Sequence, residues 1–241
     1  KYGIGAVSVI NSTHPGALAS IALNAAKKKY ICWAFTHADS LLLSYGGKRP
    51  FFGTNPICVA IPRKNEEPYC LDMSTSNYSW NKLIGHREIN KKLAKNIAAD
   101  KFGVETLNPN LARCLFPLGG YKGYGLASLI EILCGIYTGM NFGRQIPAMF
   151  TSDIKKKRKL GQFYFTMKLD ACISENSFFN RMKLLRKELK KEPTKKKQKI
   201  LLPNDKEILS EKKRIKTGIP LDQKTFLDLK KLSRKYSVNF F

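Results

Sequence analysis

Between Pro117 and Gly139 a glycine-rich loop runs directly into an apolar segment, PLGGYKGYGLASLIEILCGIYTG. Apolar residues at helical spacing on nearly every side of this segment predict a buried helix: Leu126, Leu129, Ile130, Leu133, Ile136 and Tyr137. Glycines on both sides of Lys122 predict a loop with exposed N–H groups at the helix N-terminus, which favours an anion. A tight turn without a ligand explains the loop equally well, because neither a Walker A pattern nor G-x-G-x-x-G is present.

The composition indicates a globular protein with one large core or two modest ones. The chain has 241 residues, of which 43% are hydrophobic, and no apolar run approaches the roughly 18 residues of a membrane span. Residue 1 is Lys, and Gly3 to Ile10 already has the pattern of a buried strand. We therefore expect no signal peptide and a start inside a larger protein. Six scattered cysteines without CxxC predict buried free thiols in a reducing compartment.

A formal net charge of +25 raises nucleic acid or another anionic surface as a partner. Much of the charge falls in Lys155 to Lys159 and in Lys183 to Lys199. These clusters lack interleaved aromatic residues and zinc ligands, so solvated faces are the more frequent explanation. We expect neither nucleic-acid binding nor a metal site, although a basic binding module between Lys155 and Lys216 stays open as an alternative.

The remaining pattern mixes strands with helices and predicts an α/β or α+β fold. Strands are expected at 3–10, 30–36, 57–61, 68–73 and 162–170, the third and fourth forming a hairpin. Helices are expected at 17–28, 78–90, 177–191, 205–213 and 221–236, and Ser74 to Ser76 are expected to cap the second. Loops are expected at 44–56 and 96–110, and a linker at 193–199.

Six motifs in order resemble the malate/L-lactate dehydrogenase family of the sulfolactate and ureidoglycolate dehydrogenase type. They are Asn11-Ser12-Thr13-His14, Gly46-Gly47-Lys48, Phe52-Gly53-Thr54-Asn55-Pro56, Leu71-Asp72-Met73-Ser74-Thr75-Ser76, Pro117 to Gly125, and Gly218-Ile219-Pro220-Leu221. The resemblance implies a non-Rossmann NAD(P)-binding domain with a mixed sheet over residues 1–192. It also implies that residues 200–241 form the C-terminal part of a helical domain, and that two copies make an intertwined homodimer.

The chemistry that the resemblance implies is hydride transfer between NAD or NADP and the 2-position of a small 2-hydroxy or 2-oxo acid. The malate, lactate, sulfolactate and ureidoglycolate types all remain possible substrates. His14 matches the family's catalytic histidine, and an imidazole can exchange a proton near neutral pH. A lone histidine beside a helix start more often has a capping or structural role, which is the alternative for His14.

For the cofactor, the family pattern points to residues from four segments: Ser40, Asp72, Met73, Ser74, Lys122, Asn204, Asp205 and Lys206. Lys122 and the exposed loop backbone suit a dinucleotide's phosphates. Asp72 could hold a ribose hydroxyl or cap the next turn. Asn55 is expected to shape the floor of the site, and His37 and His86 to be ordinary surface residues.

Family members carry a further N-terminal segment with a Ser-His-Gly motif and an arginine for the substrate carboxylate, and this sequence contains neither. Part of the substrate site is therefore expected either to be missing or to be supplied from outside these residues. Pro15 also stands where the family usually has Phe, and proline fixes the backbone of the turn. The main prediction is a cytoplasmic dehydrogenase without membrane contact, in which His14 and Lys122 face one crevice. The alternative is a catalytically inactive or truncated remnant that keeps the fold and dimerisation.

Overall fold

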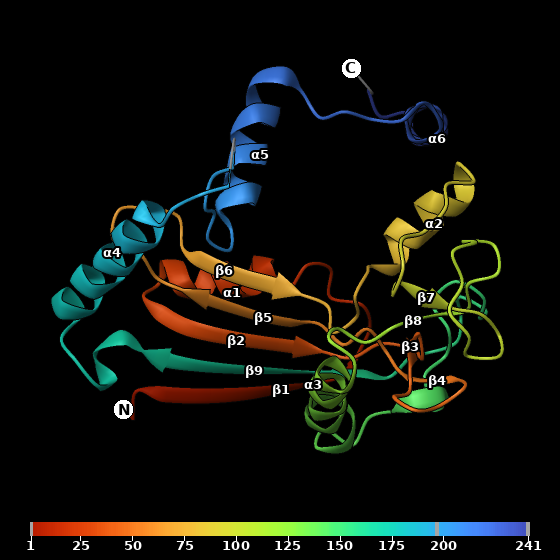
Figure 1. Ribbon diagram of the computed structural model, residues 1–241, viewed down its shortest axis with the longest axis horizontal. Helices are drawn as coiled ribbons and strands as arrows, with labels where there is room; N and C mark the ends of the chain where they lie inside the picture. Colours follow the sequence, from red (N-terminus) through yellow and green to blue (C-terminus); the bar gives the residue numbers. More distant parts are fainter. Residues whose placement is uncertain (1, 196–197, 240–241) are drawn as a thin grey trace. The chain divides into compact units, whose positions relative to one another are not determined.

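The computed structural model describes residues 2–195 and 198–239, and its helices and strands are shown in Figure 1. The chain divides into two compact units, Lys1–Pro203 and Asn204–Phe241, each of which is described by itself. The first unit holds both sheets, and the second consists of two helices, α5 (Asp205–Thr217) and α6 (Gln223–Tyr236), separated at Gly218.

A five-stranded sheet forms the centre of the first unit. Its strands, in spatial order, are β1 (Ile4–Ser12), β9 (Leu160–Lys168), β2 (Tyr30–Thr36), β5 (Ile57–Ile61) and β6 (Tyr69–Met73). Every neighbouring pair is antiparallel, including the expected β5–β6 hairpin. A Rossmann domain has a mostly parallel sheet, so the expectation of a non-Rossmann α/β fold is confirmed.

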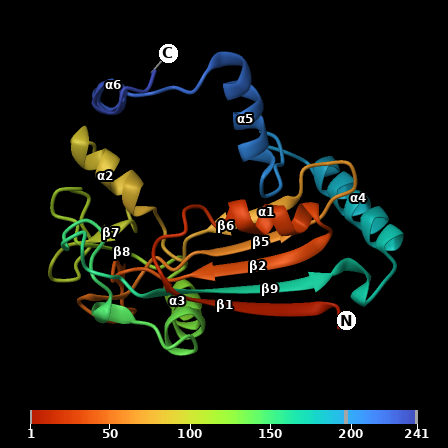
Figure 2. The same cartoon turned by 180° about the vertical axis from the view of Figure 1, so that it is seen from behind.

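Helix α1 (Ala19–Lys27) covers one face of this sheet, as Figure 2 shows from behind. Apart from Leu18, the core between them consists of small residues, namely Ala22, Ala26, Cys32, Ala34, Cys58, Ala60 and Cys70. Small side chains let the helix lie close to the strands, which excludes water from both. The expected helix at 17–28 and strand at 30–36 are thus confirmed.

Strand β1 lies at the edge of the sheet and is largely exposed, so the expectation of a buried strand was wrong. Ile4, Val7 and Ile10 are 57%, 58% and 55% exposed. The sequence pattern of β1 is apolar, but β1 pairs only with β9 in the described sheet. The prediction failed because alternation specifies a strand without specifying what packs on it.

A second sheet is built from short strands in the spatial order β4 (Pro50–Phe52), β3 (Leu42–Leu43), β8 (Cys114–Leu115) and β7 (Ala98–Ala99). Its β3–β8 pair is parallel and the others are antiparallel, so this sheet is mixed. Strands β4 and β7 lie in segments expected to be loops. Helix α2 (Trp80–Glu88) is capped by Ser79, whose Oγ accepts from Lys82 N, and not by Ser74 to Ser76 as expected.

Helix α3 (Tyr121–Glu131) continues into a π-helical turn at Ile132–Ile136 and packs on the sheet face opposite α1 (Figure 1). Ile130 and Cys134 form a buried cluster with Phe35 of β2. The opposite side of the helix is open, since Leu129, Ile132 and Tyr137 are 49%, 51% and 70% exposed. The expectation of burial on nearly every face was therefore wrong within this chain.

The segment between α3 and β9 is fastened to the sheet by a buried ion pair. Arg158 Nη2 contacts Asp39 Oδ1 with both side chains almost fully covered, and the other Asp39 oxygen accepts from Met149 N at 3.2 Å. This contact holds the lysine-rich loop beside the end of β2, and Lys155, Lys156 and Lys157 are exposed on it.

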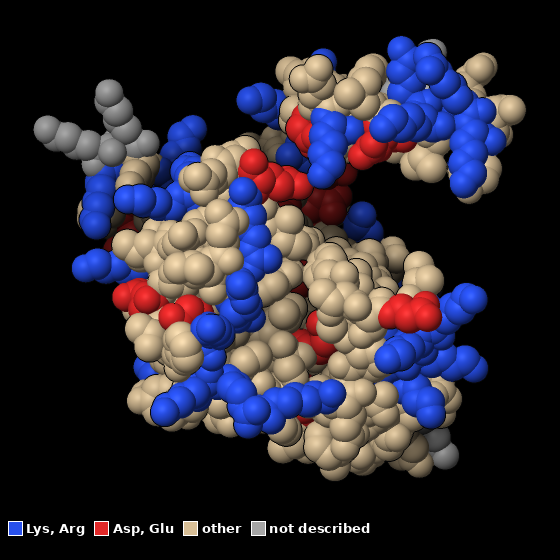
Figure 3. Space-filling view, turned by 90° about the vertical axis from the view of Figure 1, so that its right-hand side faces the viewer, with Lys and Arg blue, Asp and Glu red and all other residues tan. Residues whose placement is uncertain are grey.

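Figure 3 shows that Lys and Arg side chains on one face form several groups with neutral surface between them.

The C-terminal part of the first unit is the long amphipathic helix α4 (Glu175–Lys191), which Ser174 caps by accepting from Ser177 N. Phe179 is its buried anchor. The expected helices at 177–191, 205–213 and 221–236 correspond to α4, α5 and α6, so all three are confirmed within a few residues.

All six cysteines are free thiols, five of them buried, and Cys172 is exposed. Burial raises the pKa of Cys114 to about 11 and that of Cys134 to about 12, so both stay protonated at neutral pH. Among the described residues, no three His, Cys, Asp or Glu side chains are grouped as a metal ion would need. Within the same residues, no helix has the length and apolar character needed to cross a membrane.

We expect Gly161→Ala to destabilise the first unit by about 3 kcal/mol, because a Cβ there would lie 1.9 Å from Cys134 O. The matched control is Gly85→Ala in α2, where a Cβ meets nothing within 4 Å. This substitution should instead stabilise by about 0.5–1 kcal/mol through helix propensity. Urea unfolding of both variants measures the two effects, and equal stability of the variants would contradict this account of Gly161.

Candidate active site

The end of β6 and the start of α1 meet at one end of the five-stranded sheet (Figure 1). Asp72 Oδ2 accepts a hydrogen bond from Ala19 N at 2.9 Å, so this carboxylate satisfies a backbone donor at the start of α1. The contact fixes the β1–α1 connection, which contains His14, against the strand that carries Asp72 and Met73. This hydrogen bond is to the start of α1 and not to the turn that follows Asp72, so both roles expected for Asp72 stay predictions.

The segment after β6 is hydrogen-bonded to two loops. Thr75 N donates to Thr54 O and Leu118 N donates to Thr75 O, both at 2.9 Å, and Ser76 pairs with Pro117 as an isolated bridge. Thr75 is fully buried between these partners. The structure therefore brings the Asp72-Met73-Ser74 motif and the glycine loop side by side, although they are more than forty residues apart in sequence.

The glycine loop is shorter than expected, because α3 already begins at Tyr121. Gly119 and Gly120 adopt positive φ angles of 60° and 67°, which glycine accepts without strain. Gly123 is required for a different reason, since a Cβ there would lie 2.4 Å from Leu118 O. No side chain caps the start of α3, and Lys122 is exposed in its first turn. Backbone N–H groups and a lysine charge are thus combined at one helix terminus, as an anion site needs.

A hollow of about 540 Å³ opens beside this loop. Its lining residues are neutral and include several glycines, among them Tyr45, Gly46, Gly47, Asn77, Asn96, Gly119 and Gly120. Gly47 fits only as glycine, because a Cβ would lie 2.9 Å from Ser44 Cβ. The hollow is large enough for part of a small cofactor and lets backbone approach it closely. None of His14, Asp72 and Lys122 lines this hollow, so the single crevice expected for His14 and Lys122 stays a prediction.

His14 lies in the exposed turn between β1 and α1. Its Nδ1 accepts from Gly16 N at 3.0 Å, so in the neutral ring the proton resides on Nε2. This bond orients the imidazole within its turn. A second hollow, of about 930 Å³, begins one residue away and is lined by Asn11, Ser12, Thr13 and the loop 147–159 with its lysines. The surroundings of His14 are therefore open and positively charged, which suits an anionic substrate.

The remaining cofactor residues predicted from sequence lie in different settings. Ser40 follows β2, and its Oγ donates to Phe51 O at 2.6 Å. Asn204, Asp205 and Lys206 lie in the second unit, where Asn204 precedes α5 with a φ of 80°, Asp205 is buried and Lys206 is exposed. The roles of all the predicted residues remain predictions.

Sequence reasoning missed a buried polar cluster behind the glycine loop. Asn55, fully buried, accepts from Ala38 N at 3.1 Å and donates to Ala127 O and to Glu131 Oε2 at 2.9 and 2.7 Å. Glu131 Oε1 accepts from Gly143 N at 2.6 Å. Burial raises the pKa of Glu131, whereas these hydrogen bonds and nearby His37 oppose the increase. The only sequence signal for this cluster is a carboxylate in an otherwise apolar helix.

His37 was wrongly expected at the surface. It is 1% exposed, and its Nδ1 and Nε2 lie 3.2 Å from Gly161 O and 2.8 Å from Asn141 O. His86 is half-buried as well, with Nε2 3.0 Å from the Tyr78 hydroxyl and Nδ1 3.0 Å from Lys91 O. Both rings form polar contacts that connect different segments of the fold. Of the three histidines in the described chain, His14 is the exposed one.

Known proteins resemble this chain in sequence. It is 31% identical over 189 residues to ureidoglycolate dehydrogenase (NAD(+)) of Escherichia coli strain K12, a match that covers 78% of this chain and 52% of that protein. It is 32% identical over 238 residues to malate/(S)-sulfolactate dehydrogenase of Methanothermus fervidus, covering 98% and 68%. The chain thus matches about half the length of the first relative and about two thirds of the second.

Solved structures agree with the sequence comparison. Malate dehydrogenase from Entamoeba histolytica superposes with a TM-score of 0.89 at 29% identity, covering 99% of this chain and 70% of that one. Sulfolactate dehydrogenase from Methanocaldococcus jannaschii gives a TM-score of 0.86 at 28% identity, covering 98% and 68%. The family model described as malate/L-lactate dehydrogenase matches residues 1–230. Since this match spans nearly all of its residues, the chain belongs to the malate/L-lactate dehydrogenase family.

Proposed function

We propose that this chain is the NAD(P)-binding part of an oxidoreductase that transfers a hydride between NAD or NADP and the 2-position of a small 2-hydroxy or 2-oxo acid. Family membership supports the reaction class, and relatives are named for ureidoglycolate, sulfolactate and malate. The observation that carries the proposal is the run of contacts from Ala19 to Asp72 and from Thr75 to Leu118. These contacts gather the histidine turn, the acidic motif and the glycine loop at one end of the sheet.

The residues present fit a dinucleotide. The positive φ of Gly119 and Gly120 and the uncapped start of α3 leave backbone donors beside Lys122, and together they would hold phosphate groups. Asp72, Met73, Ser74 and Ser40 would hold the adjoining parts of the cofactor. A nicotinamide, when bound, supplies the hydride donor or acceptor.

His14 would exchange the proton on the substrate's 2-oxygen. To give a proton to the oxygen of a 2-oxo acid, His14 would act as an imidazolium, because a neutral ring that lost its Nε2 proton would become an imidazolate. Nδ1 would then carry its own proton and release Gly16 N, and the ring would be left neutral with its proton on Nδ1. In the opposite direction the same neutral ring would receive the hydroxyl proton on Nε2. The lysines of loop 147–159 would attract the acid toward this turn.

We propose that the chain works as a homodimer in the cytoplasm. Six free cysteines suit a reducing compartment. Support for association comes from the open side of α3 and its π-helical turn, where Leu129, Ile132 and Ile136 form an exposed apolar stripe at helical spacing. A second copy that covers this stripe would remove it from water.

Lys122→Ala should weaken binding of NADH or NADPH about tenfold, because it removes a charge-assisted contact to the cofactor's phosphates. Nicotinamide fluorescence during titration of the full chain measures this effect. The control is Lys187→Ala, an exposed lysine on α4, which should bind as the parent does. Equal affinities of the two variants would contradict the role given to Lys122.

His14→Asn should lower the rate of NAD(P)H-dependent reduction of a 2-oxo acid by at least about a hundredfold, since proton exchange is lost. Cofactor affinity should stay unchanged in the same variant. The rate is followed by nicotinamide absorbance with oxaloacetate, sulfopyruvate and pyruvate as substrates. A folded full gene product that binds NADH but turns over none of these acids would favour the inactive-remnant alternative.

Light scattering of the full chain should give twice the mass of one copy. The double substitution Leu129→Gln and Ile136→Gln should shift this mass toward the monomer, because it makes the apolar stripe polar. The matched control is Ile154→Gln, at a position that is 99% exposed on another loop. A parent chain that is monomeric at all concentrations would refute the homodimer.

A further inference from the structure

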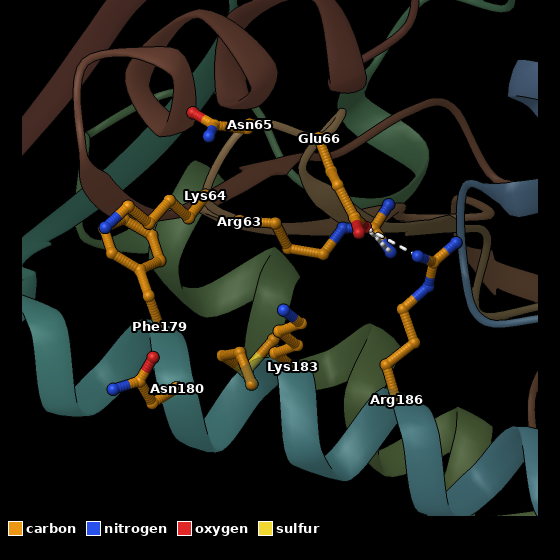
Figure 4. A pocket seen from close by; sticks show the side chains of 9 residues that line it. Arg63, Lys64, Asn65, Glu66, Phe179, Asn180, Lys183 and Arg186 are labelled. Atoms are coloured by element: carbon orange, nitrogen blue, oxygen red, sulfur yellow. Dashed lines mark hydrogen bonds and ion pairs between the residues drawn. The ribbon is translucent and has the colours of Figure 1, made fainter.

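A hollow of about 410 Å³ separates the turn of the β5–β6 hairpin, residues 62–68, from helix α4 (Figure 4). It lies at the far end of β6 from the Asp72-Met73-Ser74 motif, because the turn precedes Tyr69, the first residue of that strand. None of its lining residues belongs to the cofactor site proposed above. Its volume falls within the usual range for small-molecule sites.

Four cationic side chains from two distant segments line this hollow, against one carboxylate. Arg63 and Lys64 come from the turn, Lys183 and Arg186 come from α4, and Glu66 is the single acid. Four positive charges and one negative charge leave a surplus of three. A concave surface of one charge sign concentrates the field and attracts counter-ions of the opposite sign.

The two arginines are held in position. The Arg63 side chain is 6% exposed, and its Nε and Nη2 donate to Glu67 O at 2.6 Å and Pro68 O at 3.3 Å. Arg186 Nη1 donates to Glu66 Oε2 at 2.7 Å, and the same oxygen lies 3.9 Å from Arg63 Nη1. Figure 4 shows both guanidinium groups turned toward Glu66. Fixed guanidinium groups lose little freedom when they bind, so the cluster is preorganised.

The composition of the walls restricts the ligand. Phe179 and Met182 supply apolar surface on α4, and the cations come from the turn and from the same helix. A ligand with a single carboxylate would neutralise only one of the three surplus positive charges. A phosphoryl group offers three acceptor oxygens and up to two negative charges, and it matches the guanidinium fork.

We propose that the hollow between the β5–β6 turn and α4 is a second anion site, which binds a small molecule carrying phosphoryl groups. The site is independent of the dehydrogenase proposal, since it shares no residue with the cofactor site. A ligand there would join α4 to the hairpin and so couple the end of the first unit to its central sheet.

Calorimetric titration of the full chain with inorganic pyrophosphate at constant ionic strength tests this site. We expect one tight site in the parent chain whose affinity falls about tenfold in Lys183→Gln and in Arg186→Gln. Lys187→Gln, on the same helix but outside the hollow, should leave the affinity unchanged. Lys122→Ala should also leave it unchanged, which separates this site from the glycine loop.

Two results would overturn the proposal: no binding of pyrophosphate by the folded parent chain at millimolar concentration, or binding that Lys122→Ala weakens and Lys183→Gln does not. Circular dichroism establishes whether each variant is folded. If Arg186→Gln unfolds the helix by releasing Glu66, the exposed Lys183 decides the outcome, because its substitution disturbs no packing.

Discussion

The arrangement of the first unit depends on the buried hydrogen bonds of Asn55. This one side chain joins the end of β2 through Ala38, the start of β5 through its own backbone, and α3 through Ala127 and Glu131. An unsatisfied buried amide or carboxylate would cost about 1–3 kcal/mol each, so the three segments keep one relative position. The same network fixes the position of the glycine loop, because the loop leads directly into α3. In addition, Leu118 N in the loop donates to Thr75 O, and Thr75 N donates to Thr54 O beside Asn55.

Glu131 and His37 extend this network to the π-helical turn. The Glu131 carboxylate accepts hydrogen bonds from both Asn55 and Gly143, and these bonds stabilise its charged form, although burial raises its pKa. A neutral His37 ring can donate to only one of the two carbonyls that its nitrogens face. The hydrogen bond between His37 and Gly161 O and the close approach of Gly161 to Cys134 together hold β9 against the π-helical turn.

Much of the fold could be predicted from the sequence, because the relevant signals are local. The β5–β6 hairpin follows from two apolar runs around a charged turn, and α1 and α4 follow from their helical periodicity. The exposure of β1, the open side of α3 and the burial of His37 depend on which surfaces meet in space. No periodicity in a single segment contains that information, and two-residue strands such as β7 and β8 exist only through their partners.

The site residues show the same division between local and long-range causes. The motifs locate His14, Asp72 and Lys122 individually, but the bonds from Asp72 to Ala19 and from Leu118 to Thr75 are what bring their segments together. At the glycine loop the donors are largely backbone N–H groups, whose positions α3 fixes. At the β5–β6 turn they are side chains of Arg63, Lys183 and Arg186. Motif matching can find the first kind of anion site, because glycine is visible in a sequence. The second kind needs the structure, since its cations lie more than a hundred residues apart and resemble any other surface charges until the chain folds.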